Sequence, residues 1–478
     1  MATSLAAATT DAGAAPARPA ASDAPDPRTR ALLEGPIAAT LLRLAAPGVA
    51  VMLLQAGVGT MDGVFVGWLG AEALAGVSLV YPLLMLMQTM SAGGMGGGIA
   101  SAVARALGGG RREDADRLAA HGLLIALAMG ALFTVTLLAG GPTVYRALGG
   151  HGAALDAALA YSRVLFGGAA VFWLFNSLAS VIRGTGRMLL PAGVMAGASA
   201  LYLLLSPALV MGWGPLPRLG VAGAATASVA AFGAGTLVLA AHLLSAGSLV
   251  RLRPAGFRPR AALFGEILRV GAPGALNTVF ANLTVVLLTG LVGPFGIHAL
   301  AGYGMGARLE YIQIPIVFGV GSALVAMVGT NVGAGRIARA ERVAWVGAGL
   351  AGAITTAIGL TFAVFPHAWL GLFTTEPAVL ETGTAYLRIV GPFYGFFGVG
   401  LALYFASQGA GRLAWPLLAG FLRLVVAATG GWLATRWLGG GPSSVFVAIA
   451  VALVVMGVMV VIPIKAGAWR RGREESRS

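Results

Sequence analysis

The sequence contains no cysteine, which excludes disulfide bonds and metal sites built from thiolates. Its five histidines are scattered and do not have the spacing of metal ligands. Charged residues make up 10% of the chain, far below the roughly 25% of a soluble globular protein. The chain has no Walker motif, and no catalytic set of Ser, His and Asp or of paired carboxylates converges by spacing. These absences argue against an enzyme, against direct use of ATP and against a bound cofactor.

Hydrophobic residues make up 58% of the 478 residues and gather in long runs. A bilayer core needs about 20 consecutive apolar residues per helix, and such runs recur along nearly the whole chain. We therefore predict an all-α polytopic membrane protein with the lipid bilayer as its surroundings. Twelve spans are expected, near 41–69, 75–104, 118–140, 158–182, 189–211, 221–245, 270–292, 298–330, 343–365, 384–407, 413–437 and 444–464.

The net charge of +14 would suggest nucleic acid in a soluble protein, but the positions of the arginines indicate membrane topology instead. Loops on one side carry Arg105, Arg111, Arg112, Arg117, Arg183, Arg187, Arg251, Arg253, Arg258 and Arg260. The opposite loops have little beyond Arg146, Arg218 and Arg436. Since positive loops stay in the cytoplasm, both termini are expected there, with no nucleic-acid partner.

The two halves of the chain repeat each other. "LRLAAPG" at 42–48 returns as "LRVGAPG" at 268–274, and "RGTGR" at 183–187 returns as "QGAGR" at 408–412. Further matches, "ALAG" and "YSR", follow at nearly the same offset of 225 or 226 residues. An even number of spans per copy gives both copies the same orientation, which predicts two parallel six-helix lobes with a central cavity and rocking between them. A duplication retained for packing alone is the alternative.

The repeat also divides the chain into five parts. We predict a disordered cytoplasmic tail over 1–37, an N-lobe over 38–245, a cytoplasmic linker over 246–268, a C-lobe over 269–465 and a basic tail over 466–478. One chain then holds both lobes, and a monomer is expected.

Asp62, in "GTMDGVFVGW", is an acid inside an apolar span. About seven residues of span follow it, which places it roughly 10 Å from the outer end of the helix. Because burying a charge there costs a few kcal/mol, the default interpretation is a functional group facing a cavity and able to exchange protons. Gln55 lies on the same helical face. The alternative is that Asp62 only bonds an adjacent helix in a wet crevice.

Glu310 is the other acid well inside a span, in "GARLEYIQIP". It shares a face with Tyr303 and Gln313, whereas Arg308 is two residues away and cannot pair with it on that helix. A structural role for Glu310 and Arg308 is slightly favoured over a functional one. Packing roles are also expected for Arg163 and Arg388, which match in the repeat. Further candidates for the substrate cavity are Met87, Gln88, Asn277 and Asn282, of which Met87 would suit an adaptable pocket.

The chain resembles the multidrug and toxic compound extrusion (MATE) family over roughly residues 38–465. The resemblance lies in "MDGVFVGWLGAEALAG", in "VGTNVGAG" with its counterpart "LGGGRRED", and in "RGTGR" with "QGAGR". It implies a twelve-helix inner-membrane antiporter that expels organic, often cationic, small molecules in exchange for H+ or Na+. Asp62 then matches the first-helix acid that takes up the proton in proton-driven members.

The chain departs from the family pattern in two places. The fifth helix reads "ALYLLLSPALV", with Tyr202 and Ser206 where the family often has Asn and Asp-Pro, so coupling partners for Asp62 are expected among Tyr202, Ser206 and Asn176. Asn282 lies near the position of a glutamate in sodium-linked members, and the tenth span has no carboxylate. The expected coupling ion is therefore H+, with Na+ the less favoured choice.

Three other functions remain open. Lipid-linked oligosaccharide flippases share the parallel lobes, but they need clustered cationic side chains in the cavity, for which Arg308, Arg163, Arg388 and Arg423 are the candidates. A transporter of the major facilitator type fits less well, because "ALGGGRRED" meets its loop pattern poorly. A membrane scaffold without transport leaves Asp62 unexplained.

Overall fold

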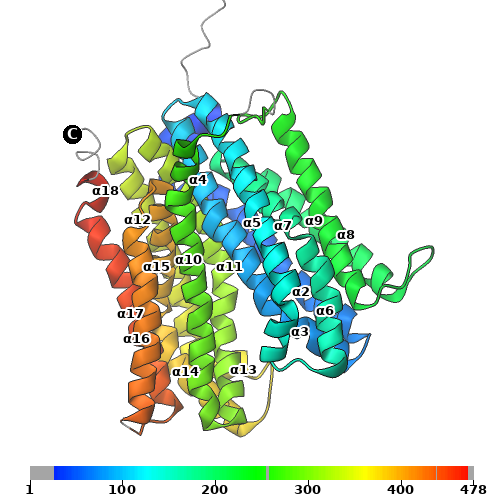
Figure 1. The fold of residues 1–478 in the computed structure, drawn as a ribbon. Coiled ribbons are helices and arrows are strands. Elements are labelled where there is room, and N and C mark those ends of the chain that lie inside the picture. Colours follow the sequence, from blue (N-terminus) through cyan, green and yellow to red (C-terminus); the bar gives the residue numbers. More distant parts are fainter. Residues whose placement is uncertain (1–25, 254–257, 438, 472–478) are drawn as a thin grey trace, which may run out of the picture.

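The computed structural model describes residues 26–253, 258–437 and 439–471, and within these ranges the regular structure is entirely helical (Figure 1). The first lobe consists of α2 (Ile37–Gly67), α3 (Ala71–Thr89), the π-helix η1 (Met90–Met95), α4 (Gly96–Gly108), α5 (Arg112–Ala147), α6 (Gly152–Gly167), α7 (Ala169–Gly184), α8 (Leu189–Met211) and α9 (Val221–Leu244). The second consists of α10 (Ala261–Val292), η2 (Gly293–Phe295), α11 (Ile297–Gly333), α12 (Ile337–Val364), α13 (Pro366–Leu370), α14 (Pro377–Val390), η3 (Gly391–Phe393), α15 (Tyr394–Ala410), α16 (Ala414–Arg436) and α17 (Pro442–Lys465).

In the described residues, eleven helical segments are long and apolar enough to cross a membrane. The twelfth span is a pair, α6 and α7, which bends by 46° at its break. Gly167 and Gly168 stand at this break, where the absence of a side chain at Gly168 lets Val229 of α9 approach. The structure therefore confirms the prediction of a twelve-span, all-α membrane protein.

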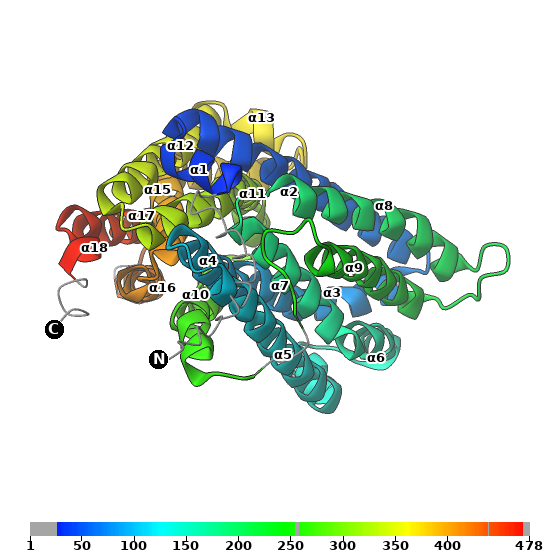
Figure 2. The ribbon, with the colours of Figure 1, turned by 90° about the horizontal axis from the view of Figure 1, so that it is seen from above.

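The helices form two lobes that lie side by side when viewed along the bundle (Figure 2). In the N-lobe α2 packs on α8, α4 on α7, α5 on α7 and α8 on α9. The equivalent C-lobe pairs also pack, namely α10 on α16, α11 on α15, α12 on α15 and α16 on α17. The recurrence of these pairs confirms two parallel lobes of six spans.

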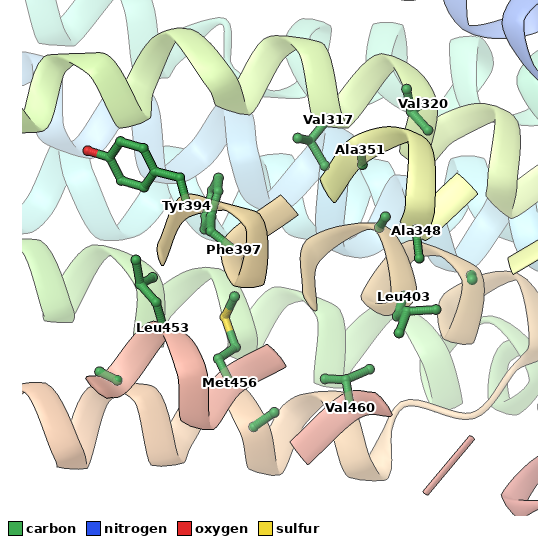
Figure 3. Close-up of a cluster of buried hydrophobic side chains, with 14 of the residues drawn as sticks. Val317, Val320, Ala348, Ala351, Tyr394, Phe397, Leu403, Leu453, Met456 and Val460 are labelled. Atoms are coloured by element: carbon green, nitrogen blue, oxygen red, sulfur yellow. The ribbon is translucent and has the colours of Figure 1, made fainter. Parts of the chain in front are cut away.

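Each lobe has its own apolar core. The N-lobe core centres on the fully buried Trp173, Phe166, Phe172 and Phe175. The C-lobe core joins α11, α12, α15 and α17 through residues such as Val317, Ala348, Phe397 and Leu453 (Figure 3). The two cores meet where the lobes touch, since Leu41 and Ala45 of α2 belong to the C-lobe cluster, and Leu263 and Ile267 of α10 belong to the N-lobe cluster.

The chain ends differ from the sequence prediction. Residues 1–25 and 472–478 lie outside the described residues, but residues 27–34 form a helix, α1 (Pro27–Glu34), where a disordered tail was expected. Asp26 caps this helix by accepting from the Arg28 amide, Pro27 begins it, and Leu32 and Leu33 are buried. The expected linker also ends early, because α10 begins at Ala261. A four-residue helix, α18 (Ala468–Arg471), likewise lies within the expected tail.

α1 lies across the ends of both lobes. The amide of Asn331 donates to the Leu32 carbonyl at 3.1 Å, and the guanidinium of Arg336 donates to the Leu33 carbonyl at 3.0 Å. Arg339 donates to the Gly35 carbonyl just beyond the helix, at 2.5 Å. On the N-lobe side, the Leu32 side chain lies against Gly186. The C-lobe thus supplies the polar contacts of this helix, and the N-lobe an apolar one.

The glycine-rich stretch "GGMGGG" forms part of the seam between the lobes. Gly94 lies against the backbone of Ala275, and Gly98 against the backbone of Gly271, both on α10. The Gln408 amide of α15 inserts from the C-lobe and donates to the Gly93 carbonyl at 3.0 Å. The stretch therefore allows close helix packing, since a side chain at Gly98 would overlap the facing backbone.

The seam continues to the helix ends that carry the arginine-rich loops. Ser101 of α4 donates to the Gly409 carbonyl at 3.1 Å, and Gly108 lies against the backbone of Thr330. In contrast, Gly57, Gly59 and Gly63 in the second half of α2 have no neighbouring atom within 4 Å of an added Cβ. The close backbone contacts between the lobes therefore gather at one end of the bundle.

Candidate functional site

Asp62 lies on α2 five residues before the helix ends at Gly67. The Tyr202 hydroxyl of α8 donates a hydrogen bond to the Asp62 Oδ1 atom. The Ser206 hydroxyl, one turn further along α8, donates to the Tyr202 oxygen at 3.4 Å. Tyr202 is 6% exposed and Ser206 is fully buried. A relay of hydroxyl groups thus leads from the interior of the N-lobe to the carboxylate.

The packing of α2 on α8 holds this pair in place. Val58, one turn before Asp62, belongs to a small apolar cluster with Ala198, Tyr202 and Leu209 of α8. The carboxylate therefore approaches the tyrosine hydroxyl because the two helices are already in contact below it. Breaking the hydrogen bond would loosen the link between the first and fifth helices of the lobe.

Other polar groups that the sequence analysis missed surround the pair. Tyr81 of α3 and Tyr161 of α6 are close enough to Asp62 to interact with it electrostatically, and Ser228 of α9 lies beside the Tyr202 hydroxyl. Tyr161 belongs to the repeated "YSR" motif, so the repeat carried a signal for it. Four helices of the N-lobe, α3, α6, α8 and α9, therefore contribute polar side chains around the acid on α2.

Two of the expected partners of Asp62 lie elsewhere. Gln55 lies two helical turns away on α2, about 10 Å along the axis, too far for a direct hydrogen bond. Asn176 of α7 donates to Ser91 Oγ at 2.8 Å and to Gln88 Oε1 at 3.2 Å. These two partners lie on η1 and α3, because α7 packs against η1 and α4 and not against α2. Met87 is fully buried in the N-lobe core.

Glu310 forms an ion pair in the C-lobe. Its Oε1 atom accepts from the Arg423 Nη2 atom of α16 at 2.7 Å, and both side chains are largely buried, at 15% and 17% exposure. Tyr303 stacks with Phe446 and meets Tyr386 edge to face, at centroid distances of 6.2 and 5.6 Å. The structure thus brings Tyr303, Glu310 and an unexpected partner, Arg423, into the same region.

The remaining C-lobe candidates do not gather around a single point. Gln313 is buried and donates to the Leu309 carbonyl at 3.3 Å, while Asn282 donates to the Thr278 carbonyl at 2.9 Å. Asn277 lies against Gly420 of α16. Of the arginines expected to be structural, Arg308 lies 5.5 Å over the Phe373 ring, and Arg163 and Arg388 are exposed.

For the proton-coupled efflux that the family resemblance implies, replacing Tyr202 by phenylalanine is expected to slow transport by about five- to tenfold. The change keeps the ring but removes the hydroxyl that bonds Asp62, and a buried polar group left without its partner costs roughly 1–3 kcal/mol. The Ser206→Ala variant should have a smaller effect, because Ser206 acts through Tyr202. Transport rates in proteoliposomes would measure both, and a Tyr202→Phe variant as fast as the native protein would refute the relay.

A family model described as MatE matches residues 47–208 and 273–433, one match in each lobe. The chain belongs to this MATE family. The two matches begin at Pro47 and Pro273, the prolines that stand at equivalent positions in the repeat. Members of the MATE family are transporters, so this chain is a multi-pass membrane transporter and not an enzyme.

Proteins similar to this MATE chain include an FAD transporter of Shewanella oneidensis, 27% identical over 83% of this chain and 87% of that protein. A probable multidrug resistance protein NorM of Deinococcus radiodurans is 31% identical over 82% of this chain and 86% of its own. Among solved structures, a MOP superfamily transporter from Pyrococcus furiosus, described as having a binding pocket of reversed polarity, has a TM-score of 0.86 and 25% identity, covering 94% of this chain and 99% of that one. These similarities support efflux transport as the function of the family to which the chain belongs.

Proposed function

We propose that this MATE transporter is a secondary antiporter that exports drug-like organic compounds in exchange for H+, and that Asp62 takes up the proton. The hydrogen bond from Tyr202 to Asp62 carries this proposal, because it joins α2 to α8 through a group that can change its charge. The equivalent position in the C-lobe is Leu288, so only one copy of the duplicated helix has the acid. An acid that is present in only one of the two copies is more consistent with a role in proton uptake than with a role in helix packing.

Protonation would change which arrangement of the N-lobe is favoured. A charged Asp62 holds the Tyr202 hydroxyl strongly, whereas a neutral carboxylic acid accepts a weaker bond. The proton thus shifts a population between two packings of α2 and α8, with a coupling free energy of about 1–3 kcal/mol expected. Uptake of a proton from outside would release the substrate, and loss of the proton to the cytoplasm would reset the transporter.

The alternatives receive less support. A sodium site in the C-lobe would lack a carboxylate at Asn282, whose amide is bonded to its own helix. A flippase would need Arg163, Arg308, Arg388 and Arg423 to converge, but the side chains of Arg163 and Arg388 are exposed. Of these, Arg308 and Arg423 have different partners.

The proposal includes the setting in which the transporter works. We place it in a bacterial inner membrane as a monomer with both termini in the cytoplasm, since the arginine-rich loops all lie on that side. The close contacts of the seam would then face the cytoplasm, and the chain as described would be closed on that side.

An efflux screen with imposed gradients tests the coupling. Reconstituted vesicles preloaded with candidate substrates are exposed to a pH gradient alone or to a sodium gradient alone. We expect the pH gradient to drive export about tenfold or more faster than the sodium gradient, because Asp62 exchanges protons. Equal rates with both gradients, or export driven by sodium alone, would contradict the proposal.

A further inference from the structure

The ion pair of Glu310 and Arg423 has no part in the proposed proton step. It lies in the other lobe, on α11 and α16, which hardly pack against each other. The pair therefore bridges a space between two helices, with the Arg423 guanidinium lying 5.5 Å over the Phe397 ring. Figure 3 shows Phe397 next to Tyr394 in the C-lobe core.

Stability does not account for this pair. Moving two charges out of water costs several kcal/mol each, and apolar residues of similar size often stabilise a fold equally well. In a membrane-spanning segment the default interpretation of such charges is a functional site. Asp62 provides the proposed coupling in the N-lobe, so recognition of the substrate is the role left for the pair.

Aromatic side chains surround Glu310. Tyr303 and Tyr311 on α11, Tyr386 on α14 and Tyr394 on α15 all lie within electrostatic reach of its carboxylate. Tyr311 is 48% exposed and lies within the same reach of Tyr81 of the N-lobe, which is 50% exposed. The site therefore faces the other lobe through two partly open aromatic rings, which suit an aromatic or apolar substrate body.

The chemistry of the pair decides which charge it attracts. The Arg423 guanidinium keeps its positive charge, and its natural partner is an anionic oxygen, which Glu310 supplies in this structure. The charged and titratable groups described around Glu310 are Arg423 and the four tyrosines, and a tyrosine is neutral at physiological pH. An anion that displaces Glu310 would therefore meet a permanent positive charge in partly buried surroundings, whereas a cation would find the carboxylate already paired.

We propose that Arg423 recognises an anionic group, a carboxylate or a phosphate, on an aromatic or apolar substrate, and that Glu310 occupies the guanidinium until this substrate arrives. A planar guanidinium binds a carboxylate and a phosphate alike through two parallel hydrogen bonds, so the proposal includes both groups. The proposal rests on the efflux function above and names its substrate class. It replaces the cation preference that the family resemblance implied.

Three naphthalene probes test the charge preference on the purified full-length chain. They are 1-naphthoate, 1-naphthyl phosphate and the cation 1-naphthylmethylammonium, and binding is measured in detergent without any ion gradient. We expect the native chain to bind one or both anions more tightly than the cation, and the better anion identifies the group. Tighter binding of the cation would overturn the proposal.

Variants then separate recognition from structure. Arg423→Gln should weaken anion binding by about tenfold or more, because a charge-assisted hydrogen bond is lost, and Arg423→Lys should restore part of it. Glu310→Gln keeps the shape but frees the guanidinium, so it should bind the anion more tightly than the native chain. A purely structural pair predicts instead that Glu310→Gln binds more weakly, and that result would overturn the proposal even if Arg423→Gln fails to fold.

The proposal of proton coupling through Asp62 and the proposal of an anion site at Arg423 can be refuted independently. Asp62→Asn should bind the anionic probe as the native chain does, although it should not export it under a pH gradient. If binding follows the pattern above but no gradient drives export, the proton-coupling proposal is wrong and the anion site stands. If a pH gradient drives export of the cation only, the anion site is wrong and the coupling stands.

Discussion

Asp62→Asn is expected to reduce efflux driven by a pH gradient by roughly 5- to 150-fold, the range set by a coupling free energy of 1–3 kcal/mol. Asparagine has the size of aspartate, and its carbonyl oxygen can still accept from the Tyr202 hydroxyl. It cannot take up or release a proton, so the link between α2 and α8 is fixed in one state. Substrate uptake into inverted vesicles under an imposed pH gradient, acidic inside, measures the effect.

Two controls identify the cause of that loss. Substrate exchange without any gradient should persist in Asp62→Asn, because binding does not require the proton. Asp156→Asn is the matched variant, since Asp156 is an exposed acid on α6 of the same lobe, and its export rate should equal that of the native protein. Undiminished pH-driven export by Asp62→Asn would show that this carboxylate does not couple transport.

Gly98→Val is expected to lower transport by about tenfold or more through the seam between the lobes. A Cβ at Gly98 would lie 2.7 Å from the backbone nitrogen of Gly271 and 2.9 Å from the Ile267 carbonyl oxygen, so the facing helices would have to move apart. Overpacking of this kind typically costs 1–3 kcal/mol, and here it penalises only the state in which the seam is closed. The transporter should then remain open at the arginine-rich end.

The absence of cysteine makes this prediction simple to measure. A single cysteine at Ala104, which is fully buried at the seam, should resist a water-soluble maleimide in the parent chain and react in the Gly98→Val background. Gly193→Val on α8 is the matched control, because an added Cβ there has no neighbour within 4 Å. Protection of the cysteine in both backgrounds would show that the seam tolerates the extra side chain.

The spans and the two lobes could be predicted because both depend on local information. Apolar runs long enough to cross a bilayer appear in the sequence directly, and matches such as Pro47 with Pro273 establish the duplication. The helix α1 has a local start signal in Asp26 and Pro27 that the sequence analysis did not use, but its position could not be predicted, because its polar contacts come from residues about 300 positions away, such as Asn331. No local pattern contains that information.

The part of the candidate site that depends on local information could also be predicted from the sequence. Asp62 was conspicuous because an acid in an apolar run is costly, and Tyr202 followed from the position of the fifth helix in the family. Asn176 was placed next to the wrong helix, since its position along α7 does not reveal that it faces Gln88. The ion pair of Glu310 with Arg423 joins residues 113 positions apart, and only the folded C-lobe brings them together.

The position of α1 sets how easily the arginine-rich end can open. Its described side-chain hydrogen bonds come from the C-lobe, while the Leu32 side chain also lies against Gly186 of the N-lobe, so opening this end would separate that contact. Exposing one leucine side chain costs at most about 3 kcal/mol, and Leu32 would expose only part of its surface. The size of a single side chain therefore tunes the opening equilibrium from outside the membrane, at a position remote from both the proton and the substrate.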